Sequence, residues 1–261
     1  MSEPALPQGQ PGPELDRAAL DWHGSFPGLG SLDIHADGSV RVAPDGAERE
    51  REAALRHGWA DLLAFSQLGF SMAAGAVLAP GPDASGALLV CGDPPEVAAV
   101  ALGLTAHGWS LVSDRPTPTQ WEHAALVAHP RPAPLIVGRH LASLAGRDRQ
   151  SVRTGSDALA IDVNRRSTPV QVSAIARVQR RRPDEDRLTE LHGHRRLERA
   201  ATIMIGGALS AAGADADPTA VVDEHLRLAG LPWCEARIDE DTHDTVGALI
   251  AWWTDLAREP A

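Results

Sequence analysis

The chain has 261 residues and a formal net charge of -11, with 43% hydrophobic and 23% charged residues. It is long enough to bury a sizeable core and has no apolar run of transmembrane length, so we expect a globular protein without membrane association, cytoplasmic by default. The acidic balance argues against broad nucleic-acid binding, because phosphates would meet a repulsive field. All basic residues are arginines, which excludes any mechanism that needs a lysine.

The N-terminal quarter predicts a tail followed by a small domain. Residues 1–27 are rich in Pro, Gly and Gln and predict a disordered tail. Residues 31–44 predict a hairpin around an Asp-Gly turn, and residues 48–70 predict an amphipathic helix. We therefore expect a small N-terminal α+β part over residues 28–74 and a larger α/β core over residues 75–261.

The first part of the core predicts a strand, a turn, a helix and a second strand. Residues 71–92 predict two strands joined by a Gly/Pro/Asp turn. Asp93 stands at the expected N-cap of a helix, Pro94 at its first position and Glu96 at its third, which resembles a capping box. The helix is expected to end at Gly108, and residues 109–114 predict a short buried strand.

The second part of the core alternates strands and helices. Residues 123–138 predict an extended, proline-broken segment followed by a short helix at residues 141–144. Residues 157–181 predict two strands, residues 184–212 a helix, and residues 212–220 a loop. A helix over residues 220–230, a strand over residues 234–238 and an amphipathic helix over residues 242–257 complete the expected order.

The stretch GALLVCGDPPEVAAVALGLTAHGWSLVSDRPTP, residues 86–118, resembles the core segment of the HPr serine kinase/phosphorylase family. Residues 129–137 and 169–191 are similar to later segments of the same family, particularly of its compact relatives in bacterial peptide natural-product clusters. The resemblance implies a P-loop kinase-like fold and a nucleotide site in the turn after the first strand. It also allows a homo-oligomer.

That turn departs from the G-x-x-x-x-G-K-[ST] pattern that cradles phosphates in the family. Gly92 matches the first glycine, but Val97, Ala98 and Ala99 replace the last glycine, the lysine and the hydroxyl residue. Prolines remove two backbone donors, and a triphosphate about 5 Å from a carboxylate would meet roughly 3 kcal/mol of repulsion per charge pair at an effective dielectric of about 20. We expect a degenerate phosphate loop without a nucleotide cofactor, made of Gly92, Asp93, Pro94, Pro95, Glu96, Val97, Ala98 and Ala99.

One catalytic position of the family has a match in this chain. The resemblance aligns Asp114 with the first of two paired aspartates, the base that acts on the serine hydroxyl, and Arg115 with the second. Asp114 as a simple turn cap before Pro116 is the favoured alternative. An active phosphotransferase with Asp114 as base and Arg115 as phosphate ligand stays open as the second hypothesis.

Two groups of side chains are candidates for binding a partner. Arginines are concentrated around residues 177–182 and again at Arg195, Arg196 and Arg199, where they either grip an acidic peptide or pair with nearby acids. The adjacent residues Trp252 and Trp253 cannot both lie on the inward-facing stripe of one helix, so one of them is a candidate contact for a partner. The candidate partner-binding residues are Arg177, Arg180, Arg181, Arg182, Trp252 and Trp253.

The remaining reactive side chains predict no site. His192, His194 and Glu198 supply too few ligands on one helix face for zinc, so we expect no metal and a solvated surface. Cys91 and Cys234 form no disulfide framework and are expected to be buried and inert. The favoured hypothesis is a non-catalytic, HPr kinase-like accessory protein that binds a peptide or partner protein of its own pathway.

Overall fold

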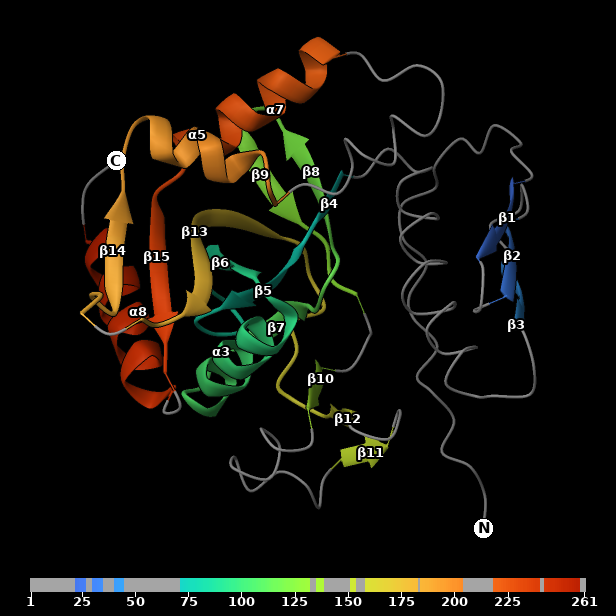
Figure 1. The fold of residues 1–261 in the computed structure, drawn as a ribbon, viewed down its shortest axis with the longest axis horizontal. Helices are drawn as coiled ribbons and strands as arrows, with labels where there is room; N and C mark the ends of the chain where they lie inside the picture. The colour runs from blue at the N-terminus through green and yellow to red at the C-terminus, as the bar shows by residue number, and fades with distance from the viewer. Residues whose placement is uncertain are drawn as a thin grey trace.

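The computed structural model describes residues 22–26, 30–34, 40–44, 71–131, 135–138, 151–153, 158–182, 184–203, 218–239 and 242–258. Figure 1 shows the arrangement of their strands and helices. The helices predicted over residues 48–70 and 141–144 lie outside these ranges. Within them, no helix combines the length and the hydropathy that a bilayer crossing requires.

The N-terminal strands form a sheet of their own. β1 (Trp22–Phe26), β2 (Gly30–Ile34) and β3 (Val40–Pro44) pair antiparallel in the order β1-β2-β3. The pairing of β2 with β3 confirms the hairpin predicted around the Asp-Gly turn. β1 lies within the predicted tail, so at most residues 1–21 can belong to that tail.

A nine-stranded mixed sheet dominates the described part of the chain. Seven strands follow the order β4-β8-β9-β13-β6-β5-β7, while β15 pairs with β13 and β14 pairs with β15. The bounds of these strands are Ser71–Ala73 (β4), Gly75–Ala79 (β5), Gly86–Gly92 (β6), Ser110–Ser113 (β7), Thr117–Glu122 (β8), Ala125–Ala128 (β9), Val170–Arg180 (β13), Leu188–Leu191 (β14) and Trp233–Ile238 (β15).

β13 is the centre of this sheet. It runs parallel to β6 on one side, and on the other side it pairs first with β9 and then, in parallel, with β15. Its sequence VQVSAIARVQR places β-branched and small apolar residues where both faces are covered. Because β6, β13 and β15 are parallel, their carboxyl ends meet at one edge, the place where α/β proteins commonly build sites.

Helices cover both faces of the sheet. α3 (Pro94–Ala106) and α8 (His243–Leu256) pack on one face, and α5 (His194–Ala200) and α7 (Pro218–Gly230) pack on the other (Figure 1). α3 is apolar almost all round, as expected for a helix enclosed by its neighbours. The α/β class predicted from the sequence is therefore confirmed.

A second small sheet lies against α3. It consists of β10 (Leu135–Gly138), β12 (Ala158–Ile161) and β11 (Ser151–Arg153), paired antiparallel in the order β10-β12-β11. Leu135, Val137 and Ile161 are buried in the same hydrophobic cluster as α3. The small sheet and α8 thus both pack on α3 besides the large sheet.

Three sequence predictions about the elements are wrong. Residues 188–191, predicted as helix, form β14, because pairing with β15 outweighs their helical propensity. The sequence predicts no strand at β8, and the first of the two strands predicted over residues 71–92 is divided into β4 and β5. β4 pairs with β8 inside the large sheet, so the domain boundary expected between residues 74 and 75 falls within that sheet.

Candidate functional site

The turn after β6 contains a glycine that the packing of the sheet requires. Gly92 has a φ of 138°, and a Cβ on it would lie 2.1 Å from the carbonyl oxygen of Val178 on β13. Only glycine tolerates both the positive φ and this approach. The match of Gly92 to the first glycine of a phosphate loop therefore has a structural explanation that involves no phosphate.

The start of α3 differs from the capping box predicted from the sequence. Asp93 is at the N-cap position, but its side chain makes no capping hydrogen bond. Pro95, the second helical residue, has no N–H to offer an N-cap oxygen, and the N–H of Glu96, the third, donates no hydrogen bond to the side chain of Asp93. Glu96 instead pairs with Arg180 of β13, with 3.5 Å between Oε1 and Nε.

The positions that correspond to the catalytic half of a phosphate loop are inside the core. Val97, Ala98 and Ala99 are 0%, 2% and 6% exposed and belong to the hydrophobic cluster between α3, the sheet and α8. Side chains at these positions face apolar neighbours. Small buried side chains thus stand at the positions where the phosphate-loop pattern has a lysine and a hydroxyl residue.

Asp114 and Arg115 lie at the end of β7 and contact the start of α3. Oδ1 of Asp114 accepts hydrogen bonds from the backbone N–H and from Nε of Arg115, at 2.8 and 3.3 Å. Nη1 of Arg115 donates to the carbonyl oxygen of Pro94. The structure therefore brings the candidate catalytic pair next to Pro94 at the start of α3.

The charges around the start of α3 balance. Asp93, Glu96 and Asp114 contribute three carboxylates, while Arg115, Arg131 and Arg180 contribute three guanidinium groups. Arg131 is buried and donates to the carbonyl oxygen of Arg115 at 3.3 Å. Three carboxylates beside three guanidinium groups leave these six residues without a net positive charge to hold a triphosphate.

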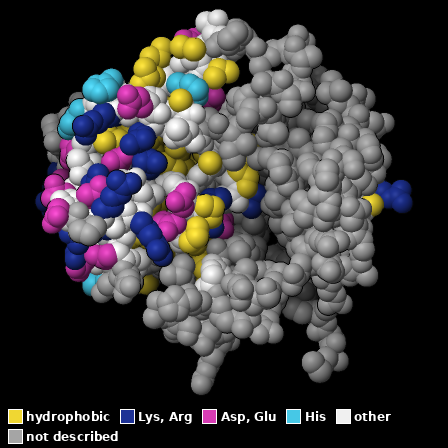
Figure 2. All heavy atoms as spheres, in the orientation of Figure 1, with side chains coloured by type: hydrophobic (Ala, Val, Ile, Leu, Met, Phe, Trp, Pro, Cys, Tyr) yellow, Lys and Arg dark blue, Asp and Glu magenta, His cyan; other side chains and the backbone are white. Residues whose placement is uncertain are grey.

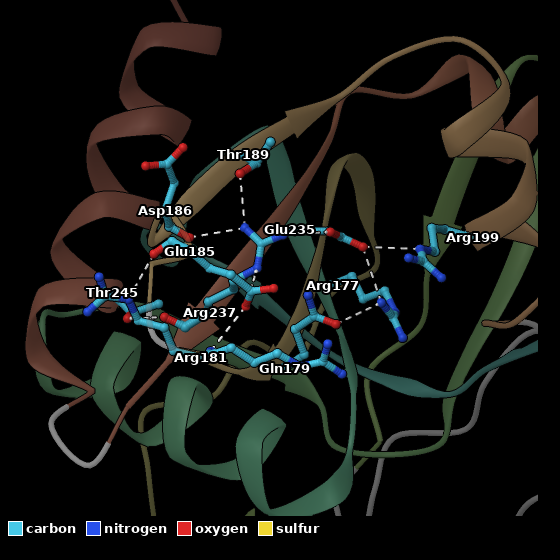
Figure 3. Close-up of polar contacts among 11 residues, drawn as sticks. Arg177, Gln179, Arg181, Glu185, Asp186, Thr189, Arg199, Glu235, Arg237 and Thr245 are labelled. Carbon is cyan, nitrogen blue, oxygen red and sulfur yellow. Dashed lines mark hydrogen bonds and ion pairs between the residues drawn. The ribbon is translucent and has the colours of Figure 1, made fainter.

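A second polar group lies on the other side of β13, where three arginines surround one buried carboxylate (Figure 3). Glu235 of β15 is 6% exposed. Its Oε1 lies 3.2 Å from Nη1 of Arg177 and 3.1 Å from Nε of Arg199, and its Oε2 lies 3.2 Å from Nη2 of Arg237. We call Glu235, Arg177, Arg199 and Arg237 the Glu235 cluster.

Sequence reasoning identified Arg177 and Arg199 but missed Glu235 and Arg237. The residue register explains the grouping, because Arg177 of β13 lies directly opposite Glu235 of β15 and Cys91 of β6. The signal available in the sequence was the alternation in WCEARI, where Glu235 and Arg237 share one face of a strand.

The side chains of Arg180 and Arg181 pair with acids of this chain, and Arg182 contributes a backbone contact. Nη1 of Arg181 lies 3.3 Å from Oδ2 of Asp239, and the backbone N–H of Arg182 donates to Glu185 at 3.1 Å. Arg180 is 89% exposed at its side chain and pairs with Glu96. Of the four arginines predicted to bind a partner, Arg177 is thus the one that belongs to the Glu235 cluster.

The two tryptophans of α8 are less exposed than the sequence suggested. Trp252 is buried, and its Nε1 donates to Glu190 at 3.1 Å. Trp253 is half-buried and packs edge-on against Trp109, with 5.5 Å between ring centroids. Trp253 is therefore the more exposed of the two rings, and its role as a partner contact stays a prediction.

The cysteines are buried, as predicted, and the histidine group is on the surface. Burial raises the pKa of Cys91 to about 12, against the opposing effect of Arg177. Burial also raises the pKa of Cys234 well above its ordinary value, with further increases from Cys91, Glu190 and Glu235. His192, His194 and Glu198 are exposed, and the described residues contain no group of three or more potential metal ligands.

Comparison with known proteins finds a distant likeness in structure. No protein-family model matches the chain, and no curated protein matches it. Among solved structures, the HPr(Ser) kinase/phosphatase from Coxiella burnetii is similar over 72% of this chain and 99% of its own, with 12% sequence identity and a TM-score of 0.36. The family is the one that residues 86–118 resemble, but at this TM-score we draw no conclusion about activity from it.

Proposed function

We propose that this chain is a non-catalytic binding protein built on an HPr kinase-like α/β core whose phosphate site is closed. Its ligand is a peptide or partner protein, and its pathway, by the resemblance of residues 86–118, is the modification of ribosomal peptides. The observation that carries the proposal is the contact of Arg115 with the carbonyl oxygen of Pro94, at the helix end where a phosphate would otherwise lie.

The surrounding residues support a closed site. Pro94 and Pro95 offer no N–H to a phosphate. The residues at the lysine and hydroxyl positions are buried alanines, and Asp114 is only 3% exposed, so a substrate hydroxyl has little access to its carboxylate. A nucleotide would have to displace Arg115 from Pro94 and Asp114 and would gain no lysine or magnesium ligand in return.

Calorimetric titration of magnesium–ATP, magnesium–GTP and pyrophosphate into the full chain tests this proposal. We expect no heat of binding and no shift in melting temperature, because a ligand stabilises a protein only by binding its folded state. Dissociation constants in the micromolar range for any of the three would contradict the proposal. A titration of the variant Arg115→Ala then shows whether the Arg115 contact is what closes the site.

An active phosphotransferase is the second candidate, and one observation favours it. The guanidinium group of Arg115 contacts the carboxylate of Asp114, and Arg131 donates to the carbonyl oxygen of Arg115, so two arginines lie in the neighbourhood that such an enzyme would use. Transfer of phosphate from labelled ATP to a serine peptide, lost in Asp114→Asn, would support this candidate. Absence of transfer in the unmodified chain would exclude it for that substrate and donor.

A further inference from the structure

The Glu235 cluster combines a buried carboxylate with two arginines that solvent can reach. Among its arginines, Arg237 makes the most contacts within the protein, since its Nη1 also donates to Thr189 and to the carbonyl oxygen of Asp186, both at 3.0 Å. Glu185 lies 3.2 Å from Nε of Arg237 as well. Arg237 is therefore held within the protein and has a structural role.

Arg177 and Arg199 differ from Arg237 in exposure and in the donors that they use. Their side chains are 27% and 37% exposed, against 13% for Arg237. A guanidinium group carries five N–H donors, and the contacts within the described residues use Nη1 of Arg177 and Nε of Arg199. Both groups thus keep donors that Glu235 does not take.

Glu235 fixes the two guanidinium groups next to each other. Both lie within 3.2 Å of the same oxygen, one coming from β13 and the other from α5 (Figure 3). Three arginines face two carboxylates, Glu235 and Glu185, so the group keeps one positive charge. Two like charges held side by side with an incomplete set of counterions attract an anion, and their fixed position lowers the entropy cost of binding it.

We propose that Arg177 and Arg199 form a receptor for an oxyanion, either carboxylate or phosphate, on the side chain of an acidic peptide. This inference rests on the proposed binding function and names its surface and ligand chemistry. A planar guanidinium group matches both oxyanions through paired N–H donors. Nucleic acid is disfavoured, because the chain has a net charge of -11 and the receptor offers only a local positive charge.

Exposed apolar side chains on the helix that carries Arg199, and on the helix packed against it, favour a peptide over a free anion. The exposed large apolar side chains of the described residues are Leu197 of α5 and Val222 and Leu226 of α7, and these two helices pack on each other. Figure 2 shows apolar side chains at the top of the view, over α7, and arginines mixed with acids over β14 and β15. A peptide that carries both acidic and apolar residues would use both surfaces.

Fluorescence anisotropy with the full chain and three labelled peptides tests the proposal. The peptides share alternating leucines and differ in carrying glutamate, phosphoserine or glutamine, and inorganic phosphate serves as competitor. We expect the glutamate and phosphoserine peptides to bind and the glutamine peptide to bind at least about tenfold more weakly, because it lacks the charge. Inorganic phosphate should compete only at much higher concentrations than either acidic peptide.

Variants locate the binding to the receptor. Arg199→Gln and Arg177→Gln should each weaken binding of the acidic peptides about tenfold or more, and Arg199→Lys should weaken it nearly as much, since an ammonium group cannot form the fork. Arg258→Gln, which removes an exposed arginine paired with Asp255 on α8, should leave the affinity unchanged. If Arg177→Gln fails to fold by circular dichroism, the two Arg199 variants decide.

The outcomes separate this inference from the proposed function. The inference is wrong if no acidic peptide binds the unmodified chain, if the glutamine peptide binds equally well, or if the Arg199 variants keep full affinity. It is also wrong if inorganic phosphate binds as tightly as the peptides, which would make the ligand a free anion. Micromolar binding of magnesium–ATP would instead refute the proposed function, whatever the peptides do.

Discussion

Glu235 contacts side chains from three elements, so replacing it should lower the free energy of unfolding. In Glu235→Gln, three arginines lose a buried anionic partner, and the charge-assisted hydrogen bonds to Arg177, Arg199 and Arg237 are weakened. We expect a loss of about 2 kcal/mol in the free energy of unfolding, or roughly 4–8 °C in melting temperature. The value is at the low end for a broken buried ion pair, because two of the arginines are partly exposed.

Glu198→Gln is the matched control for this substitution. Glu198 lies on the exposed side of α5, one residue from Arg199, and should change the free energy of unfolding by no more than about 0.5 kcal/mol. Thermal and urea denaturation followed by circular dichroism measure both variants. Equal melting temperatures for the two variants would show that the Glu235 cluster contributes nothing to stability.

The two buried thiols predict a dependence of stability on alkaline pH. Burial raises the pKa of Cys91 from an ordinary value of 9.0 to about 12, so the folded state binds this proton more tightly than the unfolded state. The stabilisation is complete below pH 9 and is lost as the pH rises towards 12, at up to about 1.4 kcal/mol per pH unit. Cys91→Ala should flatten the alkaline decline of stability measured by urea denaturation.

Thiol titration with a disulfide reagent at pH 8 gives an independent measure of the same burial. The thiolate is the reactive form, and burial disfavours it in Cys91 and Cys234. The native protein should therefore react very slowly, and two thiols should appear once the chain is unfolded in guanidinium chloride. Rapid reaction of either cysteine in the native protein would be inconsistent with the buried positions described above.

At the scale of single elements, the turn between β6 and α3 is the most constrained. Gly92→Ala places a Cβ 2.1 Å from a backbone oxygen of β13, which cannot move without distorting the central strand. We expect a loss of about 3 kcal/mol or more, from overpacking combined with the positive φ. Denaturation in urea, followed by tryptophan fluorescence, measures the change in the free energy of unfolding.

Gly108→Ala separates the cost of the steric clash from the cost of the positive φ. Gly108 also has a positive φ, 86°, but a Cβ there would have no atom within 4 Å. Its substitution should cost only about 1 kcal/mol, the contribution of backbone strain without a clash. If both alanine variants lose the same free energy, the close approach of β6 to β13 is not what requires glycine at position 92.

Several elements can be predicted from short stretches of sequence, because the residues that specify them lie within the element or its turn. The hairpin of β2 and β3 has its Asp-Gly turn, α3 has its proline start, and α8 has an apolar stripe ending in Leu256. β14 was missed because LTEL carries no strand signal of its own and becomes a strand by pairing with β15. The sequence does not predict the absent cap at Asp93, since Pro95 lacks a donor but Glu96 keeps its N–H.

At the scale of the whole molecule, the Glu235 cluster could not be read from the sequence. Arg177, Arg199 and Glu235 come from β13, α5 and β15, and only the parallel pairing of two strands far apart in the chain brings them together. The contact between Arg115 and Pro94 was nearer to prediction, because a strand, turn, helix and strand in succession return the chain to the same edge. The pairing register of β13 with β15 decides which of their side chains come into contact, and this register cannot be predicted from the sequence of either strand alone.

The topology of the large sheet predicts a hierarchy of local stability. β13 is paired along both sides, whereas in the described part of the chain β4 and β14 each pair with a single neighbour. Opening of an edge strand exposes few buried contacts, while opening of β13 breaks the pairing with β6, β9 and β15 and exposes the cores on both faces. Amides of the central strand should therefore exchange only through global unfolding.

Hydrogen–deuterium exchange followed by mass spectrometry of peptides measures this order. We expect the amides of β6 and β13 to exchange about tenfold or more slowly than those of β14. The amides of β15 should exchange at an intermediate rate, because β15 pairs with β13 on one side and with β14 on the other. A destabilising variant such as Gly92→Ala should speed amide exchange in β13 by the factor that corresponds to the full loss of global stability. Exchange in β14 should speed up much less. Equal protection of β14 and β13 would mean that the sheet opens as one unit and that β14 is not an independent edge.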